Sequence, residues 1–424
     1  MKRLFICTPA HATQGGVERI LEALAQGLPQ RGYDVLFGLA KGARFHDPSR
    51  FRAALPSIRG VDIDGSSGTG YGRRRALRRA IVDADPDVVL IARMYDAYPV
   101  CAALKAEGHR MRLTVTIQAY EREYFPDLRA YAEWLDFCVT SGNLIANAVA
   151  HFTSLPRERI RSIPGGVAAP RRFVAHDDTR PVRIGYAGRL EEMQKRALDL
   201  ATTAEELCRR DVPFTLDVAG DGSAAAELHA RLPDARFHGW LSHEELYASI
   251  YPELDVLVHF AEWEGITIAP REAMAHGVVP VVSRFLGSEV EGEFVDGENS
   301  LTFPVGDVHA AADAIERLHR DRPLLRRLSA AARASQSGIR SHEGAIDAWA
   351  EAFDSVLASP QRPGVSLPPV PRDRGTLERL PAPLAELVRR ARRIEYAEPG
   401  GEWPHWSGMR DEALFEELAR FARM

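Results

Sequence analysis

Short apolar runs rich in β-branched residues recur along the chain, and each is followed by a stretch whose apolar residues have helical spacing. In the first part these runs predict strands at residues 3–8, 35–40, 87–92, 113–117, 137–141 and 160–163. A second series predicts strands at residues 182–188, 214–220, 235–239, 256–261, 278–282 and 300–303. Apolar strands that alternate with helices are typical of parallel sheets covered on both faces. The pattern predicts an α/β protein with two doubly wound, Rossmann-like domains.

The two series also predict where the domains begin and end. We expect an N-terminal domain at residues 1–170, a C-terminal domain at 181–340 and a helix at 341–358 that returns to the N-terminal domain. A Pro-rich connector at 359–374 and a helical extension at 375–424 follow. Ligands of open parallel sheets bind beyond the carboxyl ends of the strands, so we expect the site in the cleft where the two domains face each other.

The first candidate for ligand binding directly follows the first predicted strand. Gly15 and Gly16 stand at the start of a helical pattern in "TQGGVERILEALAQGL". A helix N-terminus offers unpaired N–H groups to an anion, and glycine lets the anion approach the backbone. A tight turn without a ligand is the alternative interpretation.

A second candidate is the pair of cations in "GYAGRLEEMQKRALDL", again directly after a strand. Arg189 can chelate diphosphate oxygens with its planar guanidinium, while Lys195 supplies a point charge. Together they would stabilise a departing nucleotide as negative charge develops on it. The alternative is a solvated charged loop.

The third candidate is a pair of carboxylates in "EWEGITIAPREAMAHGVVPVV". Glu264 lies in a predicted loop, and Glu272 lies in the opening turns of a helix that ends at Gly277. Carboxylates accept hydrogen bonds from vicinal hydroxyls, so this pair suits the sugar and the ribose of a nucleotide sugar. A favourable position near the positive end of a helix would explain Glu272 alone, but not Glu264.

These elements, in this order, resemble the retaining glycosyltransferases of GT-B architecture, of the family 4 or group 1 type. The resemblance runs from residue 3 to about 330 and is carried by "YAGRL", "VAGDGS", "EGITIAPREAMAHGVVPVVS" and "EFVDGENSLTFPVGD". It implies that the first domain binds the acceptor and the second binds the nucleotide sugar. Arg189 and Lys195 would hold the diphosphate, Glu264 the donor sugar and Glu272 the ribose.

The resemblance also implies a set of glycines and backbone groups around the donor. Gly15 and Gly16 would close on the phosphates, and Gly220 and Gly222 would approach the nucleotide. The full donor-binding set that it implies is Gly15, Gly16, Gly188, Gly220, Gly222, Gly265, Ile266, Thr267 and Glu272.

The first domain departs from the family pattern. Its relatives often carry a His after a mid-domain strand, whereas this chain has Gln118 near that place. Polar residues that follow first-domain strands are our candidates for the acceptor side, with surface or packing roles as the alternative. They are His11, Arg93, Asp96, Gln118 and Glu121.

Composition narrows the classes of partner and compartment. A net charge of −5 from 54 basic and 59 acidic residues gives no global field for nucleic acid. No stretch approaches the apolar length of a membrane span, and the apolar run at the N-terminus is too short for a secretory signal, so we expect a cytoplasmic protein. A basic amphipathic stretch could hold it at the inner face of an anionic membrane, or could be a solvated helix face. Its arginines are Arg73, Arg74, Arg75, Arg78 and Arg79.

The expected reaction is transfer of a sugar from a nucleotide diphosphate to an acceptor hydroxyl, with retention, in glycan or polysaccharide biosynthesis. The acceptor could be a glycan, a lipid-linked sugar or a small molecule. We expect no cofactor and no metal site; the spacing of Asp62 and Asp64 in "VDIDG" is too common to predict one. A nucleotide-sugar epimerase of the same architecture and a non-catalytic binding subunit are the alternatives.

Overall fold

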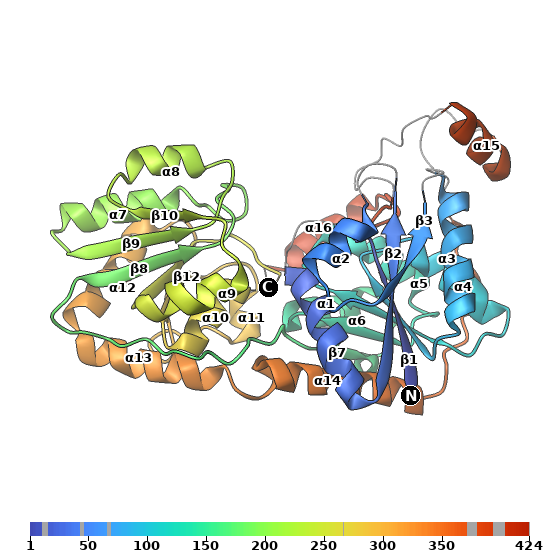
Figure 1. Ribbon diagram of the computed structural model, residues 1–424, viewed down its shortest axis with the longest axis horizontal. Coiled ribbons are helices and arrows are strands. Elements are labelled where there is room, and N and C mark those ends of the chain that lie inside the picture. The colour runs from blue at the N-terminus through green and yellow to red at the C-terminus, as the bar shows by residue number, and fades with distance from the viewer. Residues whose placement is uncertain are drawn as a thin grey trace. The chain divides into compact units, whose positions relative to one another are not determined.

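The structure, a computed structural model, describes residues 1–10, 16–42, 46–65, 69–265, 267–370, 380–392 and 403–423. The chain divides into two compact units. Unit 1 comprises residues 1–164 and 346–422, and unit 2 comprises residues 165–345. Each unit is a sheet with helices packed around it (Figure 1). Unit 2 is therefore inserted in the sequence of unit 1.

Unit 1 is built on a parallel sheet in the order β3-β2-β1-β4-β5-β6-β7. Its strands are β1 (Lys2–Thr8), β2 (Tyr33–Lys41), β3 (Gly60–Asp64), β4 (Val88–Ala92), β5 (Arg112–Ile117), β6 (Phe137–Thr140) and β7 (Ile160–Ser162). All but β3 were predicted. That strand lies at the edge of the sheet and is largely accessible, so it lacks the continuous apolar run of a central strand.

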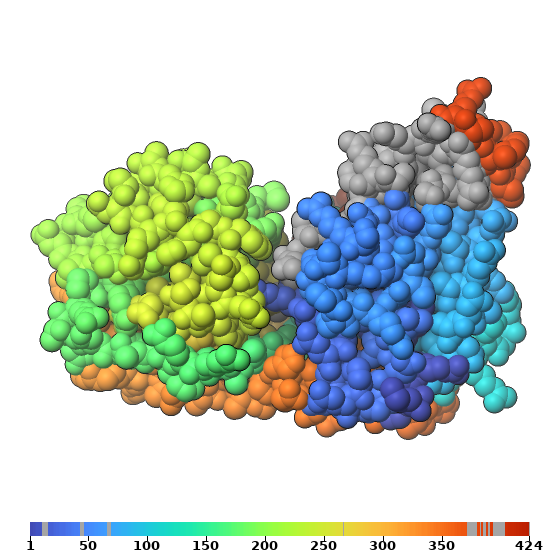
Figure 2. All heavy atoms as spheres, in the orientation of Figure 1, coloured from blue at the N-terminus to red at the C-terminus, as the bar shows by residue number. Residues whose placement is uncertain are grey.

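The helices of unit 1 surround this sheet, with one exception. They are α1 (Gly16–Gly27), α2 (Pro48–Ala54), α3 (Gly70–Ala84), α4 (Ala97–Ala106), α5 (Phe125–Tyr131), α6 (Asn143–Phe152), most of α14 (His342–Ala358), α15 (Ala382–Arg392) and α16 (Glu412–Phe421). The exception is α15, which contacts α3 and leaves Leu384 and Leu387 exposed. Figures 1 and 2 show α15 at the surface of unit 1, next to α3.

Unit 2 has a second parallel sheet, in the order β10-β9-β8-β11-β12-β13. Its strands are β8 (Val182–Ala187), β9 (Phe214–Ala219), β10 (Arg236–Gly239), β11 (Val256–His259), β12 (Val279–Ser283) and β13 (Leu301–Phe303), all predicted. Its helices are α7 (Asp199–Arg209), α8 (Ala225–Arg231), α9 (His243–Glu245), α10 (Ile268–His276), α11 (Ser288–Glu291), α12 (Val308–Arg320) and α13 (Arg322–Ser335). The predicted fold class, two Rossmann-like α/β domains, is confirmed.

The strand order places a topological switch point in each unit. In unit 1 the order reverses between β1 and β4, and in unit 2 between β8 and β11. At a switch point the loops that leave two neighbouring strands diverge and leave room for a ligand at the carboxyl edge of the sheet. The segments that follow these four strands are therefore where the chemistry of each unit is expected.

The two ends of unit 2 are hydrogen-bonded to each other. The N–H of Val167 donates to the carbonyl of Arg340 at 2.9 Å, and the N–H of His342 donates to the carbonyl of Val167 at 2.9 Å. The unit begins at Gly165 and ends at Ala345, within α14. The remainder of α14 packs on unit 1, where Ile346 lies against Gly27.

The C-terminal extension is part of the core of unit 1. After α14, residues 359–370 contain no helix or strand, in keeping with their Pro content. Later in the extension, Trp403, Leu414, Phe415 and Leu418 are buried in the same apolar cluster as the sheet. The extension therefore covers its apolar surface with its own first unit.

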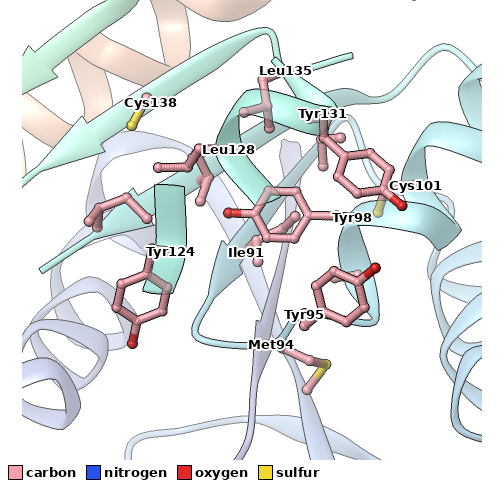
Figure 3. Packing of buried hydrophobic residues seen from close by; sticks show 14 of the residues in the cluster. Ile91, Met94, Tyr95, Tyr98, Cys101, Tyr124, Leu128, Tyr131, Leu135 and Cys138 are labelled. Atoms are coloured by element: carbon pink, nitrogen blue, oxygen red, sulfur yellow. The ribbon is translucent and has the colours of Figure 1, made fainter. Parts of the chain in front are cut away.

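One buried carboxylate links the extension to α5. Asp127 accepts a hydrogen bond from the N–H of Ser407 at 2.8 Å, and burial raises the pKa of Asp127 to about 6 although that bond opposes the rise. Figure 3 shows Tyr98 and Tyr131, two buried tyrosines of this core; burial raises the pKa of both, and the nearby charge of Asp127 raises it further. Because these surroundings solvate charge poorly, the protonated form of Asp127 is more stable in the folded protein than in the unfolded chain, relative to the charged form.

We predict that Asp127→Asn flattens the stability of the protein between about pH 3 and about pH 7. The folded pKa lies above the unfolded one, so the contribution of Asp127 is fully present below its unfolded pKa and is lost as pH rises through about 6. The loss amounts to about 3 kcal/mol in the wild type and is absent in the variant. Thermal melts of both proteins across this range measure it, and identical pH profiles would contradict the assignment.

Candidate functional site

The switch point of unit 2 brings together a lysine, a glutamate and a histidine. Lys195, in the connection after β8, donates a hydrogen bond to Oε1 of Glu264, in the loop after β11. Nε2 of His259, the last residue of β11, lies 2.8 Å from the same oxygen. Lys195 and Glu264 are thus joined although 69 residues separate them in the chain.

The charges around Glu264 keep it ionised. Its side chain is only 5% exposed, and burial alone would raise its pKa. The positive charge of Lys195 and the hydrogen bond with His259 outweigh burial and lower the pKa to about 2. Glu264 therefore presents a negative, hydrogen-bond-accepting carboxylate at neutral pH.

Arg189 stands beside this group on the same connection. Its guanidinium donates to the side-chain oxygen of Gln194 at 2.8 Å and is 58% exposed, so it is open to a ligand. The side-chain amide of Gln194 in turn donates to the carbonyl of Trp263 at 3.0 Å. The main-chain carbonyl of Gln194 accepts from the N–H of Glu262 at 2.9 Å. These bonds tie the connection after β8 to the loop after β11.

At two of the predicted donor-binding glycines, two loops approach so closely that a side chain would clash. A Cβ on Gly220 would lie 1.8 Å from the carbonyl oxygen of Gly188, and one on Gly222 would lie 2.3 Å from that of Leu190. Both glycines also have positive φ, 149° and 155°. Only glycine fits here, and the reason is the packing of the loop after β9 against the connection after β8. A nucleotide contact for these glycines stays a prediction.

Helix α10 begins at the end of the loop that contains Glu264. Gly265 and Thr267 lead into the helix, and Ile266 lies outside the described residues. The hydroxyl of Thr267 donates to Glu293 at 2.9 Å and does not cap the helix. The helix ends at Gly277, which has φ 88°, as predicted.

Glu272 is buried among groups of its own unit. Its side chain is 3% exposed, one oxygen accepts from the hydroxyl of Tyr251 at 2.8 Å and the other lies 3.0 Å from Nδ1 of His243. Glu272 thus joins α10 to Tyr251 and to the start of α9. A ribose contact for Glu272 stays a prediction.

His259, His243 and Tyr251 were missed by sequence reasoning. His259 carried a signal, because it is a polar residue at the carboxyl end of an otherwise apolar strand. His243 and Tyr251 carried none, since their contact with Glu272 depends on how their segment folds back on α10.

In unit 1 the acceptor-side candidates gather at the carboxyl ends of β4 and β5. Arg93 follows β4 with φ 60°, an unfavourable conformation for a non-glycine residue, and lies 3.6 Å from Glu18 of α1. Burial raises the pKa of the nearby Tyr124 hydroxyl, the charge of Glu121 raises it further, and the charge of Arg93 lowers it. Gln118 is buried, and its amide nitrogen donates to the hydroxyl of Thr116.

The remaining candidates of unit 1 are the segment that leads into α1 and the carboxylate of Asp96. Gly16 begins α1, while His11 and Gly15 lie outside the described residues. Asp96 has a fully buried side chain whose two oxygens accept from Arg73 at 2.6 Å and Arg74 at 3.1 Å. It therefore stabilises the fold and has no oxygen to offer an acceptor.

The same contacts correct the predicted basic face of α3. Arg73 is 2% exposed and Arg74 is directed at Asp96, so neither is available to a lipid surface. Arg78 pairs with Glu107, and the guanidinium of Arg75 lies 6.0 Å from the ring of Tyr71. In the ranges that the structure describes, no helix is both long enough and apolar enough to span a bilayer. Those ranges also contain no group of three or more potential metal-ligating His, Cys, Asp or Glu side chains.

Comparison with protein families gives two matches that fall on the two units. A model described as Glycosyltransferase Family 4 matches residues 14–170, and one described as Glycosyl transferases group 1 matches residues 181–321. A GDP-mannose-dependent alpha-mannosyltransferase of Corynebacterium glutamicum is 36% identical over 124 residues, 29% of this chain and 28% of the relative. The lipopolysaccharide core biosynthesis mannosyltransferase LpsB of Rhizobium meliloti is 37% identical over 115 residues, 26% of this chain and 31% of the relative. The chain thus matches about a third of the length of these relatives.

Solved structures share the fold over most of the chain. Anabaena HepE in complex with UDP has a TM-score of 0.69 at 17% identity, over 84% of this chain and 100% of that one. The lipopolysaccharide outer core galactosyltransferase WaaB has a TM-score of 0.66 at 17% identity, over 84% and 99%. The fold is that of the two-domain GT-B proteins. By fold the chain is a two-domain GT-B protein, and its two units match models that describe glycosyltransferase domains.

We predict that Lys195→Met destabilises unit 2 by about 3 to 5 kcal/mol, because it leaves the buried carboxylate of Glu264 without its main positive partner. Adding Glu264→Gln should recover much of that loss, since the amide carries no charge. Urea unfolding followed by hydrogen exchange of peptides from β8 and β11 measures both effects. Equal stability of the single and double variants would show that the pair does not hold the two loops together.

Proposed function

We propose that the protein is a retaining glycosyltransferase that moves a sugar from a nucleotide diphosphate to an acceptor hydroxyl in glycan biosynthesis. The observation that carries the proposal is the group at the switch point of unit 2. An exposed arginine, a lysine and an ionised glutamate stand together on the loops after β8 and β11. This is the place where open parallel sheets bind nucleotides.

Each member of the group has a chemical role in this proposal. Arg189 and Lys195 hold the diphosphate and stabilise the negative charge that develops on it as the bond to the sugar breaks. Glu264 accepts hydrogen bonds from hydroxyls of the donor sugar. When a diphosphate enters, Lys195 can turn part of its hydrogen-bonding capacity from Glu264 to the phosphate, because an ammonium has three donors.

Retention and independence from metal are further parts of the proposal. The acceptor hydroxyl attacks the face of the sugar that the phosphate leaves, and the departing phosphate accepts the proton of that hydroxyl. The two cations supply the charge that a metal ion would otherwise provide, so neither a metal nor another cofactor is required. A cytoplasmic location, with membrane contact through Arg75, Arg78 and Arg79, also belongs to the proposal.

We predict that Arg189→Ala lowers the turnover of a nucleotide sugar at least about a hundredfold and changes stability by less than about 0.5 kcal/mol. Thermal-shift screening against UDP-, GDP- and ADP-sugars identifies the donor, and its hydrolysis in buffer with EDTA then gives the rate. Arg320→Ala is the matched control, because Arg320 is an exposed, ion-paired arginine on α12 of the same unit. Full turnover by the Arg189 variant would contradict its role in holding the diphosphate. Inactivation of the wild type by EDTA would contradict the independence from metal.

We predict that the glycosidic bond of the product has the same anomeric configuration as the donor. Proton NMR of the reaction as it proceeds shows the configuration through the coupling constant of the anomeric proton. A product with inverted configuration would contradict the retaining mechanism, but it would still be consistent with sugar transfer. A new nucleotide sugar formed without any acceptor would instead favour an epimerase.

A further inference from the structure

The C-terminal segment of residues 403–421, here called the strap, runs along the carboxyl edge of the unit 1 sheet. It begins at β2 and β3, where Nε1 of Trp403 donates to the carbonyl of Lys41, the last residue of β2, at 3.1 Å. The ring of Trp403 lies so close to Gly65, directly after β3, that a Cβ there would be 2.5 Å from Nε1. The strap is thus fixed to the ends of two strands by one buried side chain.

The strap then passes the ends of β4 and β5. The N–H of Tyr95, three residues after β4, donates to the carbonyl of Pro404 at 3.0 Å. Beyond β5, the hydroxyl of Tyr120 donates to the carbonyl of Leu418 at 2.8 Å, and the guanidinium of Arg122 lies 5.0 Å from the ring of Phe415. The strap therefore follows the edge of the sheet where a Rossmann-like domain binds its ligand.

Two aromatic side chains of the strap are less deeply buried than Trp403. His405 and Trp406 lie between the buried Trp403 and the buried residues of α16, yet both remain partly exposed. The ring of Trp406 meets that of Tyr124 edge to face at 5.8 Å, and the ring of His405 lies 5.8 Å from that of Trp406. An accessible indole is thus held beside the polar residues that follow β4 and β5.

Those polar residues lie around Tyr124. The charges of Arg93 and Glu121 both act on its hydroxyl, and Arg93 also lies 3.6 Å from Glu18. An apolar aromatic surface beside a carboxylate and a guanidinium is the combination that suits a pyranose. The C–H face of the ring packs on the indole, and the hydroxyls bond to the charged groups.

We propose that the strap completes the acceptor subsite, with Trp406 as the surface on which a sugar acceptor packs and Arg93, Tyr124 and Glu121 as the groups that bind its hydroxyls. The proposal rests on the proposed function and names the acceptor as a saccharide. The strap lies beyond both matched family models, which end at residues 170 and 321.

The test compares Trp406→Ala with Phe421→Ala in the full-length protein. Phe421 is the matched control, because it is a partly buried aromatic of the same strap but packs 5.4 Å from the ring of Phe152, away from the polar group. The probes are methyl α-D-mannopyranoside and methyl α-D-glucopyranoside at millimolar concentration, with binding followed by saturation-transfer NMR. We expect at least one glycoside to bind the wild type with transfer strongest to the protons of one ring face.

Trp406→Ala should weaken that binding about tenfold, whereas Trp406→Phe should keep most of it and Phe421→Ala should match the wild type. Donor hydrolysis without acceptor should be unchanged in Phe421→Ala. The proposal is overturned if neither glycoside binds the wild type, if Trp406→Ala binds as the wild type does, or if Phe421→Ala loses as much as Trp406→Ala. A wild type that binds no nucleotide sugar would count against the proposed function instead, and the two failures are thereby distinguishable.

Discussion

The buried contact of Glu264 with Lys195 and His259 is the interaction on which the site of unit 2 depends. It joins the segments that leave β8 and β11, the two strands between which the sheet order reverses. A carboxylate in this position would be costly if it were alone, because burial opposes its charge. The lysine offsets that cost and is at the same time brought to the edge where an anionic ligand would lie. One contact thus fixes both the loop geometry and the local charge.

The glycines of unit 2 serve the same geometry. Gly220 and Gly222 allow the loop after β9 to approach the connection after β8 more closely than any side chain would permit. That connection is then held from two sides, by the glycine loop and by the bonds of Gln194 to the loop after β11. Arg189 is therefore an accessible side chain on a well-supported backbone, which is the arrangement that preorganised electrostatic stabilisation requires.

Much of the fold followed from the sequence because parallel strands that are buried on both faces leave a local signature. Twelve of the thirteen strands stand where apolar runs predicted them, and β3 was missed because an accessible edge strand has no such run. Arg189, Lys195 and Glu264 could be placed together because each follows a strand, and the carboxyl ends of parallel strands share one edge.

What the sequence did not predict depends on contacts between distant segments. Asp96 was expected to face an acceptor, but its burial with Arg73 is decided by how α3 packs and has no local pattern. The same holds for Glu272, whose partners come from the segment before β11. The path of residues 403–421 could not be predicted either. The spacing of apolar residues predicts a helix with an apolar face, but it does not predict the surface against which that face packs.

The insertion of unit 2 within unit 1 has a consequence for how the protein is made. All residues of unit 2 leave the ribosome, and its two ends can pair through Val167 and Arg340, before Trp403 and Leu418 have been synthesised. Unit 1 begins first but lacks part of its apolar core until residues 403–418 emerge. At this stage of synthesis unit 2 can be complete while unit 1 still lacks part of its core. Unit 1 is therefore the part that would need protection by chaperones.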